Sequence, residues 1–128
     1  MSVTESCVGT IDTLRQIITS PNYPKNYSLD EKCTWKLIAP KGKVFHLNVN
    51  QFHTDLYYHT LRINNGPSSS SSVMAELSGL LVPMEFKSTE NAMFIEFSTD
   101  NFNPFGGFKI KYFVVDYPGR LIIPNDEV

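Results

Sequence analysis

The chain has 128 residues, a formal net charge of −2 at pH 7 and an apolar fraction of 41%. This length favours one domain with a hydrophobic core, and the apolar fraction excludes an intrinsically disordered chain. Because long runs of like charge are absent, neither nucleic acid nor an anionic membrane is expected as a partner. No apolar run approaches the roughly 18 residues that span a bilayer, so membrane insertion is not expected either.

Short segments in which apolar and polar residues alternate recur along the chain. This period of two is typical of strands that bury one face. Eight segments share the pattern or a shorter form of it: residues 16–19, 33–39, 45–49, 61–63, 73–77, 84–86, 93–97 and 108–114. Strands at this spacing predict an all-β fold, either a sandwich or a barrel.

Four details of this interpretation concern particular segments. Asp12 could cap a helix that begins there, but residues 16–19 fit a short strand equally well, and the strand-rich context favours the strand. Residues 73–77 fit either a short strand or one helical turn. Phe52 breaks the alternation of the strand before it, which predicts a bulge or bend near Gln51. Gly106 and Gly107 predict a turn that needs a positive φ.

The chain is predicted to form a single domain over residues 1–115, followed by a C-terminal tail or linker over residues 116–128. The tail contains prolines and acidic residues. The first ten residues lack the charged start and apolar stretch of a signal peptide. The two cysteines, Cys7 and Cys33, permit either one disulfide or two free thiols. A disulfide and a missing signal peptide are compatible if the chain is a fragment of a longer secreted protein.

A series of motifs spread in order over residues 7–113 resembles the CUB domain, an extracellular β-sandwich module. The motifs are C-x-G-x-I at Cys7, I-T-S-P-N-Y-P at Ile18, C-T-W-K-L-I-A-P at Cys33, L-x-I-x-x-G at Leu61, F-S-T-D at Phe97 and G-F-x-x-x-Y at Gly107. Each motif alone is weak, but their order and spacing together are specific. The resemblance implies an antiparallel jelly-roll-like β-sandwich of about eight to ten short strands. It also implies an extracellular location and a disulfide between Cys7 and Cys33.

The number of cysteines departs from the family pattern. Members usually have a second disulfide, whose positions fall just before Tyr58 and at Ser78, and neither position is cysteine here. Because both partners are missing together, the resemblance indicates a two-cysteine variant. Asn26 starts an N-x-S sequence, which makes it a candidate glycosylation site in an extracellular protein.

The calcium-binding residues of the family are only partly kept. Many members bind calcium through three acidic residues in loops at one end, and these map onto Asp55, His59 and Asp100. An imidazole nitrogen suits calcium poorly, so we expect no metal cofactor. A degenerate calcium site at Asp55 and Asp100 is the alternative, and a zinc site formed by His53, Asp55 and His59 is a further one.

No pattern in the sequence predicts an enzyme. A hydrolase needs a nucleophile, a base and an orienting group, and neither H-E-x-x-H nor G-x-S-x-G occurs. Residues 98–100 could contribute Ser98 and Asp100 to a triad with a histidine, but Ser98 falls at a plain strand end. We therefore expect a binding function rather than catalysis.

Binding in sandwich folds concentrates in loops at one end of a rigid scaffold. The candidate ligand-binding residues are aromatic, acidic or polar and lie in two such loops: Asp55, Tyr57, Tyr58, His59, Asp100, Asn101 and Phe102. Phe105 adjoins them unless its ring turns back into the sandwich. Such a surface suits a protein ligand that carries Lys or Arg, or a neighbouring domain of the same chain, and it would also suit a glycan.

The expected function is that of a non-catalytic extracellular interaction module, secreted or in the ectodomain of a membrane protein. It would bind a protein ligand through these loops as one part of a larger multidomain protein. Two alternatives use the same kind of surface. One is a substrate-positioning domain of a modular secreted protease, and the other is a carbohydrate-binding single-module protein.

Overall fold

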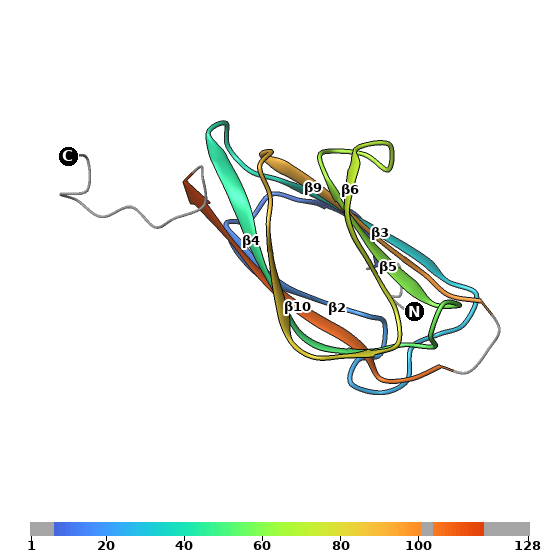
Figure 1. Cartoon of the computed structure of the whole chain (residues 1–128). Coiled ribbons are helices and arrows are strands. Elements are labelled where there is room, and N and C mark those ends of the chain that lie inside the picture. The colour runs from blue at the N-terminus through green and yellow to red at the C-terminus, as the bar shows by residue number, and fades with distance from the viewer. Residues whose placement is uncertain (1–6, 101–103, 117–128) are drawn as a thin grey trace.

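The computed structural model describes residues 7–100 and 104–116, which form ten β-strands in two facing sheets (Figure 1). Sheet A contains, in spatial order, β1 (Val8–Ile11), β3 (Lys32–Ile38), β9 (Ala92–Ser98), β5 (Thr60–Asn65) and β6 (Ser72–Leu77). Sheet B contains β2 (Arg15–Thr19), β10 (Gly107–Asp116), β4 (Lys43–His53) and β7 (Leu80–Leu81), with β8 (Met84–Lys87) also paired to β4. The pair of β1 with β3 is parallel and the other strand pairs are antiparallel. The predicted all-β sandwich is confirmed.

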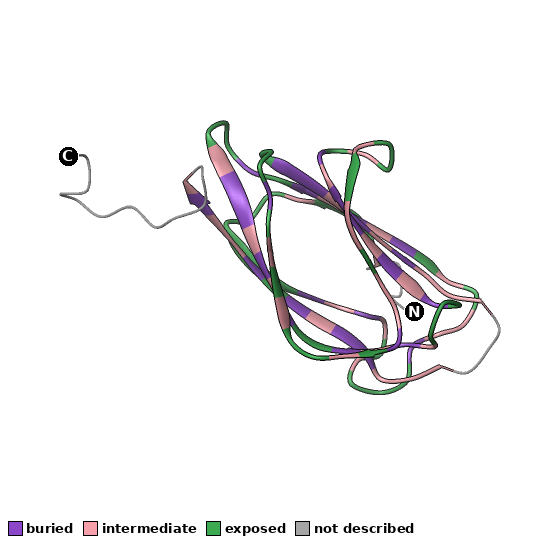
Figure 2. Cartoon of the chain, in the orientation of Figure 1, coloured by how far each residue is buried: buried purple, intermediate pink, exposed green. Residues whose placement is uncertain are grey.

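The core lies between the two sheets and follows the predicted alternation. Along β3, Cys33, Trp35 and Leu37 are buried, while the residues between them are not (Figure 2). Aromatic rings fill the space between the sheets: Phe108 of β10 meets Trp35 and Phe97 of sheet A edge-on, with centroids 6.0 and 4.9 Å away. Burial of these large rings is the main favourable contribution to folding.

β4 contains the predicted irregularity. β10 pairs Lys109 with Gln51 and the next residue, Ile110, with Val49, so Asn50 is an extra residue in β4. A single inserted residue of this kind reverses the face to which the following side chains point. It explains why Phe52, which breaks the sequence alternation, is nonetheless buried.

Three elements differ from the sequence prediction. β1 was not predicted, because its four residues are largely exposed and give no alternation. β7 has only two residues, too few for a periodic signal. β10 includes Asp116, which pairs with Lys43, so the strand extends into the predicted tail, and residues 117–128 lie outside the described part.

The open choices are resolved in favour of strands. Residues 73–77 belong to β6, and residues 12–14 link β1 to β2 rather than starting a helix. None of the described segments is a helix long and apolar enough to cross a membrane.

Gly107 fixes the start of β10 beside the loops at one end of the sandwich. Its φ of +85° lies in the left-handed region, and a Cβ there would come within 1.8 Å of the Ser20 Oγ. That hydroxyl accepts a hydrogen bond from the Phe108 backbone N–H at 3.0 Å. Only glycine leaves room for this contact, which confirms the predicted positive-φ turn.

Candidate binding loops

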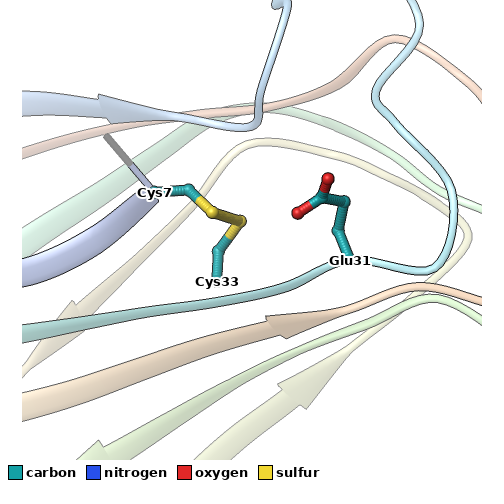
Figure 3. A group of neighbouring side chains, drawn as sticks. All are labelled: Cys7, Glu31 and Cys33. Atoms are coloured by element: carbon teal, nitrogen blue, oxygen red, sulfur yellow. A yellow bond between two sulfur atoms is a disulfide. The ribbon is translucent and has the colours of Figure 1, made fainter. Parts of the chain in front are cut away.

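The predicted disulfide joins Cys7 to Cys33, with the Cα atoms 4.9 Å apart (Figure 3). It ties the start of the described chain to the buried face of β3. Glu31 lies nearby, and within residues 7–100 and 104–116 these three side chains form the one group of potential metal ligands with ligand atoms within 4.8 Å. Both sulfur atoms are already bonded to each other, so this group is a structural staple rather than a metal centre.

The loop between β4 and β5 is held in shape by its own backbone and by the turn that precedes β7. The Asp55 carbonyl accepts hydrogen bonds from the Tyr58 and His59 backbone N–H groups at 3.2 and 3.0 Å. The Thr54 N–H donates to the Gly79 carbonyl at 2.9 Å. The Thr54 hydroxyl accepts from the Gly79 N–H at 3.0 Å and donates to the His59 carbonyl at 2.8 Å. The loop, residues 54–59, therefore has little freedom to move relative to the sheet.

The two positions of the absent second disulfide are in contact. Tyr57, the residue just before Tyr58, donates its backbone N–H to the Ser78 hydroxyl at 3.1 Å. Tyr57 has a φ of +71°, in the left-handed region. A hydrogen bond thus connects the segments at the place where the family pattern predicts a covalent bond.

His59 lies beneath the loop and joins two parts of the chain that are distant in sequence. Its ring is fully buried; Nδ1 is 2.6 Å from the Tyr27 hydroxyl and Nε2 is 2.7 Å from Asp100 Oδ1. An ionised carboxylate only accepts, so Nε2–H donates to Asp100, and the Tyr27 hydroxyl then donates to Nδ1. The same hydroxyl accepts from the Asp55 N–H at 3.2 Å, so a neutral imidazole satisfies every group in the chain.

Tyr27 is the central member of this hydrogen-bond chain. It is 2% exposed, and its ring meets the His59 and Phe97 rings edge-on at 5.3 and 5.1 Å. Burial raises the pKa of the Tyr27 hydroxyl above 10.0, and the nearby Asp55 and Asp100 carboxylates act in the same direction, against hydrogen bonds from the Asp55 and Phe105 backbone. The hydroxyl therefore remains a donor at neutral pH. This role is not predictable from local sequence, because Asp55 and His59 lie 28 and 32 residues further along the chain.

The predicted binding residues separate into exposed and internal ones. Tyr57 is 80% exposed and Tyr58 is 56% exposed, as a binding surface requires. Leu56 was not predicted, yet it is 50% exposed beside them. His59 was predicted on the same surface, and this is wrong, because both of its ring nitrogens are turned inward onto Tyr27 and Asp100.

The other predicted positions complete this account. Asp55 is partly buried, and the Asp100 side chain is 38% exposed. Asn101 and Phe102 lie outside the described residues. Phe105 stacks on His53, with ring centroids 4.2 Å apart, and packs against the core, so its ring turns back into the sandwich.

The profile of the CUB domain family matches residues 7–112. The chain belongs to the CUB domain family. Cubilin from Canis lupus familiaris is 36% identical over 110 residues, covering 83% of this CUB domain and 3% of cubilin. Tolloid-like protein 1 from Mus musculus is 34% identical over 115 residues, covering 84% of this chain and 11% of that protein. This CUB domain therefore spans a small part of the length of its relatives.

The fold is also shared with a solved structure. The full extracellular region of zebrafish Gpr126/Adgrg6 contains a domain that superposes with a TM-score of 0.77 and is 25% identical. The match covers 86% of this CUB domain and 15% of the zebrafish chain.

The loops of this CUB domain do not fit a calcium ion. Calcium takes six to eight oxygen ligands, and the position of the second acid of the family is occupied by the His59 imidazole. Its Nε2 already binds Asp100 Oδ1 at 2.7 Å, so an oxygen of the third acid is engaged. Calcium would have to break this buried hydrogen bond and accept a nitrogen neighbour. The zinc alternative also lacks support, because within the described residues His53 does not converge with Asp55 and His59.

The same CUB domain residues form an acid–histidine–hydroxyl chain, which invites comparison with a catalytic triad. The histidine between Asp100 and Tyr27 is fully buried, so a substrate cannot reach the imidazole. Ser98, the hydroxyl considered from the sequence, is the last residue of β9 and pairs with Lys32 and Thr60. The geometry supports a structural role for His59, in which it joins the loop 54–59 to the segment before Asp100.

Proposed function

We propose that this CUB domain is a non-catalytic extracellular interaction module that binds a protein ligand through the loop 54–59. The observation that carries the proposal is a run of three exposed apolar side chains, Leu56, Tyr57 and Tyr58, on a loop with a fixed backbone. The family, the disulfide and the small share of each relative that the chain covers support a module of a larger protein in an oxidising compartment.

The rigidity of the loop favours tight binding. Tyrosine offers a large amphipathic surface and loses little conformational entropy on binding, and a preformed loop lowers the ordering cost further. Leu80, which follows Gly79 and is 75% exposed, extends the apolar surface across the turn that anchors the loop. The surface therefore suits the hydrophobic centre of a protein interface.

The partly buried carboxylates of Asp55 and Asp100 define the preferred chemistry of the ligand. The Asp100 carboxylate contacts His59, whereas Asp55 donates its backbone N–H to the Tyr27 hydroxyl and does not use its carboxylate for that bond. The 38% exposed side chain of Asp100 still adds negative charge beside the loop. A protein partner with a Lys or Arg next to an apolar patch would complement this arrangement.

The test is affinity capture from an extracellular proteome, followed by binding measurements with each purified partner. Three forms of the domain are compared: the wild type, the loop variant Tyr57→Ala with Tyr58→Ala, and the control Val73→Ala. Val73 is 57% exposed on β6, so the control removes exposed apolar surface far from the loop in sequence. We expect the loop variant to lower affinity at least about tenfold, as for a residue at the centre of an interface.

Two results would contradict the proposal. In the first, partners bind the loop variant as tightly as the wild type. In the second, the control loses binding to the same extent as the loop variant. Circular dichroism and thermal melts of all three proteins check that the fold is unchanged, since all the substitutions are at exposed positions.

Glycosylation at Asn26 is part of the same proposal. Asn26 is exposed and directly precedes the buried Tyr27, so a glycan there would project into solvent. Expression in mammalian cells should give a protein whose mass falls on treatment with peptide N-glycosidase. The variant Asn26→Gln should have the lower mass from the start. An untreated wild type with the mass of the bare chain would refute this part of the proposal.

A further inference from the structure

The outer faces of the two sheets differ in how their charges are compensated. On sheet A, Lys32 pairs with Glu96 at 3.0 Å and Arg62 pairs with Glu76 at 3.5 Å, and Lys36 is the one strand cation there without an ion pair to a described residue. On sheet B, four cations point outward and form no ion pair with another residue of the described part: Arg15, Lys87, Lys109 and Lys111. The chain as a whole carries a net charge of −2, so positive charge is concentrated on this face.

The strand register places these cations on one side of three neighbouring strands and β8. Lys87 of β8 lies opposite His46 of β4, and His46 lies opposite Phe113 of β10. Phe113 in turn lies opposite Arg15 of β2. Strands are about 4.8 Å apart, so the ends of this row are separated by about 14 Å. Lys111 and Lys109 continue the face along β10, at intervals of about 7 Å.

Carboxylates offset little of this charge. Glu85 lies opposite Asn48 in the next row, and its Oε1 is 3.3 Å from His46 Nε2. At the far end of β10, Asp116 is paired with Lys43. The four cations remain free to attract an anion, and exposed cations in one cluster attract a polyanion more strongly than isolated ones do.

Two aromatic rings lie at the centre of the face, between the charges. The rings of His46 and Phe113 lie 4.8 Å apart and are tilted by 36°. A surface hollow of about 840 Å³ is lined by Phe113, with Arg15, Ile17 and Lys111 among its other lining residues. Ile17 is 48% exposed at the rim. A ligand that fits this face has regularly spaced anionic groups on an amphipathic body.

We propose that the outer face of sheet B binds a linear sulfated polysaccharide. The sulfate groups would contact Arg15, Lys109, Lys111 and Lys87, and a sugar ring would lie against Phe113. An acidic protein segment is the less favoured occupant, because the cations are spread across several strands of an open face rather than along the single free edge of β2. The proposal concerns a surface distinct from the loop 54–59 and stands or fails independently of it.

The test is isothermal titration calorimetry with a size-defined heparin oligosaccharide as the probe. The face variant carries Arg15→Ser and Lys111→Ser. The matched control carries Lys32→Ser and Lys36→Ser on β3 of sheet A, so both lose two positive charges. We expect the face variant to lose at least tenfold in affinity and to show a weaker dependence on salt, because fewer ionic contacts remain to be screened. The control should stay within about twofold of the wild type.

Each alternative result overturns the proposal in a distinct way. No heparin binding by the wild type removes it. An equal loss in the control shows attraction to net charge without a defined face. Equal binding of a desulfated oligosaccharide shows that sulfate is not recognised. Equally tight, Arg15- and Lys111-dependent binding of a polyglutamate peptide reassigns the face to an acidic protein segment. Thermal melts of both variants check that the substitutions leave the fold intact.

Discussion

Two contacts hold distant segments of the chain together near the loops, one through a disulfide and the other through hydrogen bonds. At one place a covalent bond joins Cys7 to Cys33. At the other, where the family pattern has a second disulfide, the Tyr57 N–H donates to the Ser78 hydroxyl. Beside that contact, the buried His59 connects Tyr27 to Asp100 at the position of a calcium-binding acid. Hydrogen bonds thus take the place of the second disulfide and of the acid that would bind calcium.

The difference lies in where each attachment acts. In the chain-entropy model a disulfide acts mainly by restricting the unfolded chain, so its effect does not depend on a set of further partners in the fold. A hydrogen bond exchanges water for a protein partner, and its net contribution is small while the cost of leaving a buried group unpaired is larger. The His59 attachment therefore depends on its complete set of partners, whereas the disulfide acts alone.

The largest expected effect comes from removing the disulfide. Cys7→Ala with Cys33→Ala should lower the free energy of unfolding by about 3 kcal/mol, because the loop of 26 residues is no longer closed in the unfolded chain. Urea denaturation of the oxidised proteins measures the difference. Reducing agent should cause a similar loss in the wild type and none in the variant. If the double cysteine variant loses less unfolding free energy than His59→Leu, the internal hydrogen bonds stabilise the fold more than the disulfide does.

The second effect tests the internal attachment. His59→Leu keeps most of the side-chain volume but removes the partner of Tyr27 and of Asp100, so stability should fall by about 2 kcal/mol. His46→Leu is the matched control, because its partner Glu85 is 65% exposed and surface pairs contribute at most about 1 kcal/mol. If urea denaturation gives the same loss of unfolding free energy for both variants, the buried partners of His59 contribute no more than a surface pair.

The third effect concerns the Tyr27 hydroxyl. Tyr27→Phe removes the hydrogen bonds to His59 and Asp55 and should cost about 1–2 kcal/mol at pH 7. Because burial raises the pKa of Tyr27 in the fold above its usual 10.0, the stability due to this hydroxyl is complete below pH 10 and is lost as pH rises through the folded pKa. Tyr112 also has a raised pKa but titrates in both proteins, so it cancels in the difference. A gap that stays constant from pH 7 to above pH 10 would contradict this assignment.

The smallest expected effect is that of calcium. Millimolar calcium should leave the melting temperature unchanged, because His59 Nε2 already occupies Asp100 Oδ1. Differential scanning fluorimetry with and without a chelator measures it. A clear rise that disappears in Asp100→Asn would show that calcium displaces the His59 ring from Asp100. The hydrogen bond between them would then not be a permanent attachment of the loop.

Much of the sandwich is predictable from the sequence. Alternation identifies the long strands, because residues such as Trp35, Leu47 and Ile95 must all turn to one buried side. The out-of-phase position of Phe52 predicts the bulge at Asn50. The β1 strand escapes this reasoning, because its four residues are mostly exposed and its parallel pairing with β3 leaves no periodic trace.

The candidate site is predictable only in part. Tyr57 and Tyr58 are exposed as expected, because a short polar loop with consecutive aromatics cannot bury all of them. The prediction that His59 is exposed is wrong, because the sequence around it does not show its internal partners. Whether a histidine faces solvent depends on partners elsewhere in the chain, and here Tyr27 and Asp100 approach from segments 32 and 41 residues away.

The sequence by itself determined the family, because its motifs occur in order along the chain, and the longer strands, because their alternation is local. The disulfide followed only from the family resemblance, since two cysteines alone also permit free thiols. Only the tertiary structure decided that His59 is enclosed, that Tyr57 and Ser78 touch, and that uncompensated cations gather on the outer face of sheet B. The physical reason is the same in each case. Hydrogen bonding and charge compensation depend on groups that pairing brings within a few ångströms, and the register between strands is set by the packing of the whole sandwich.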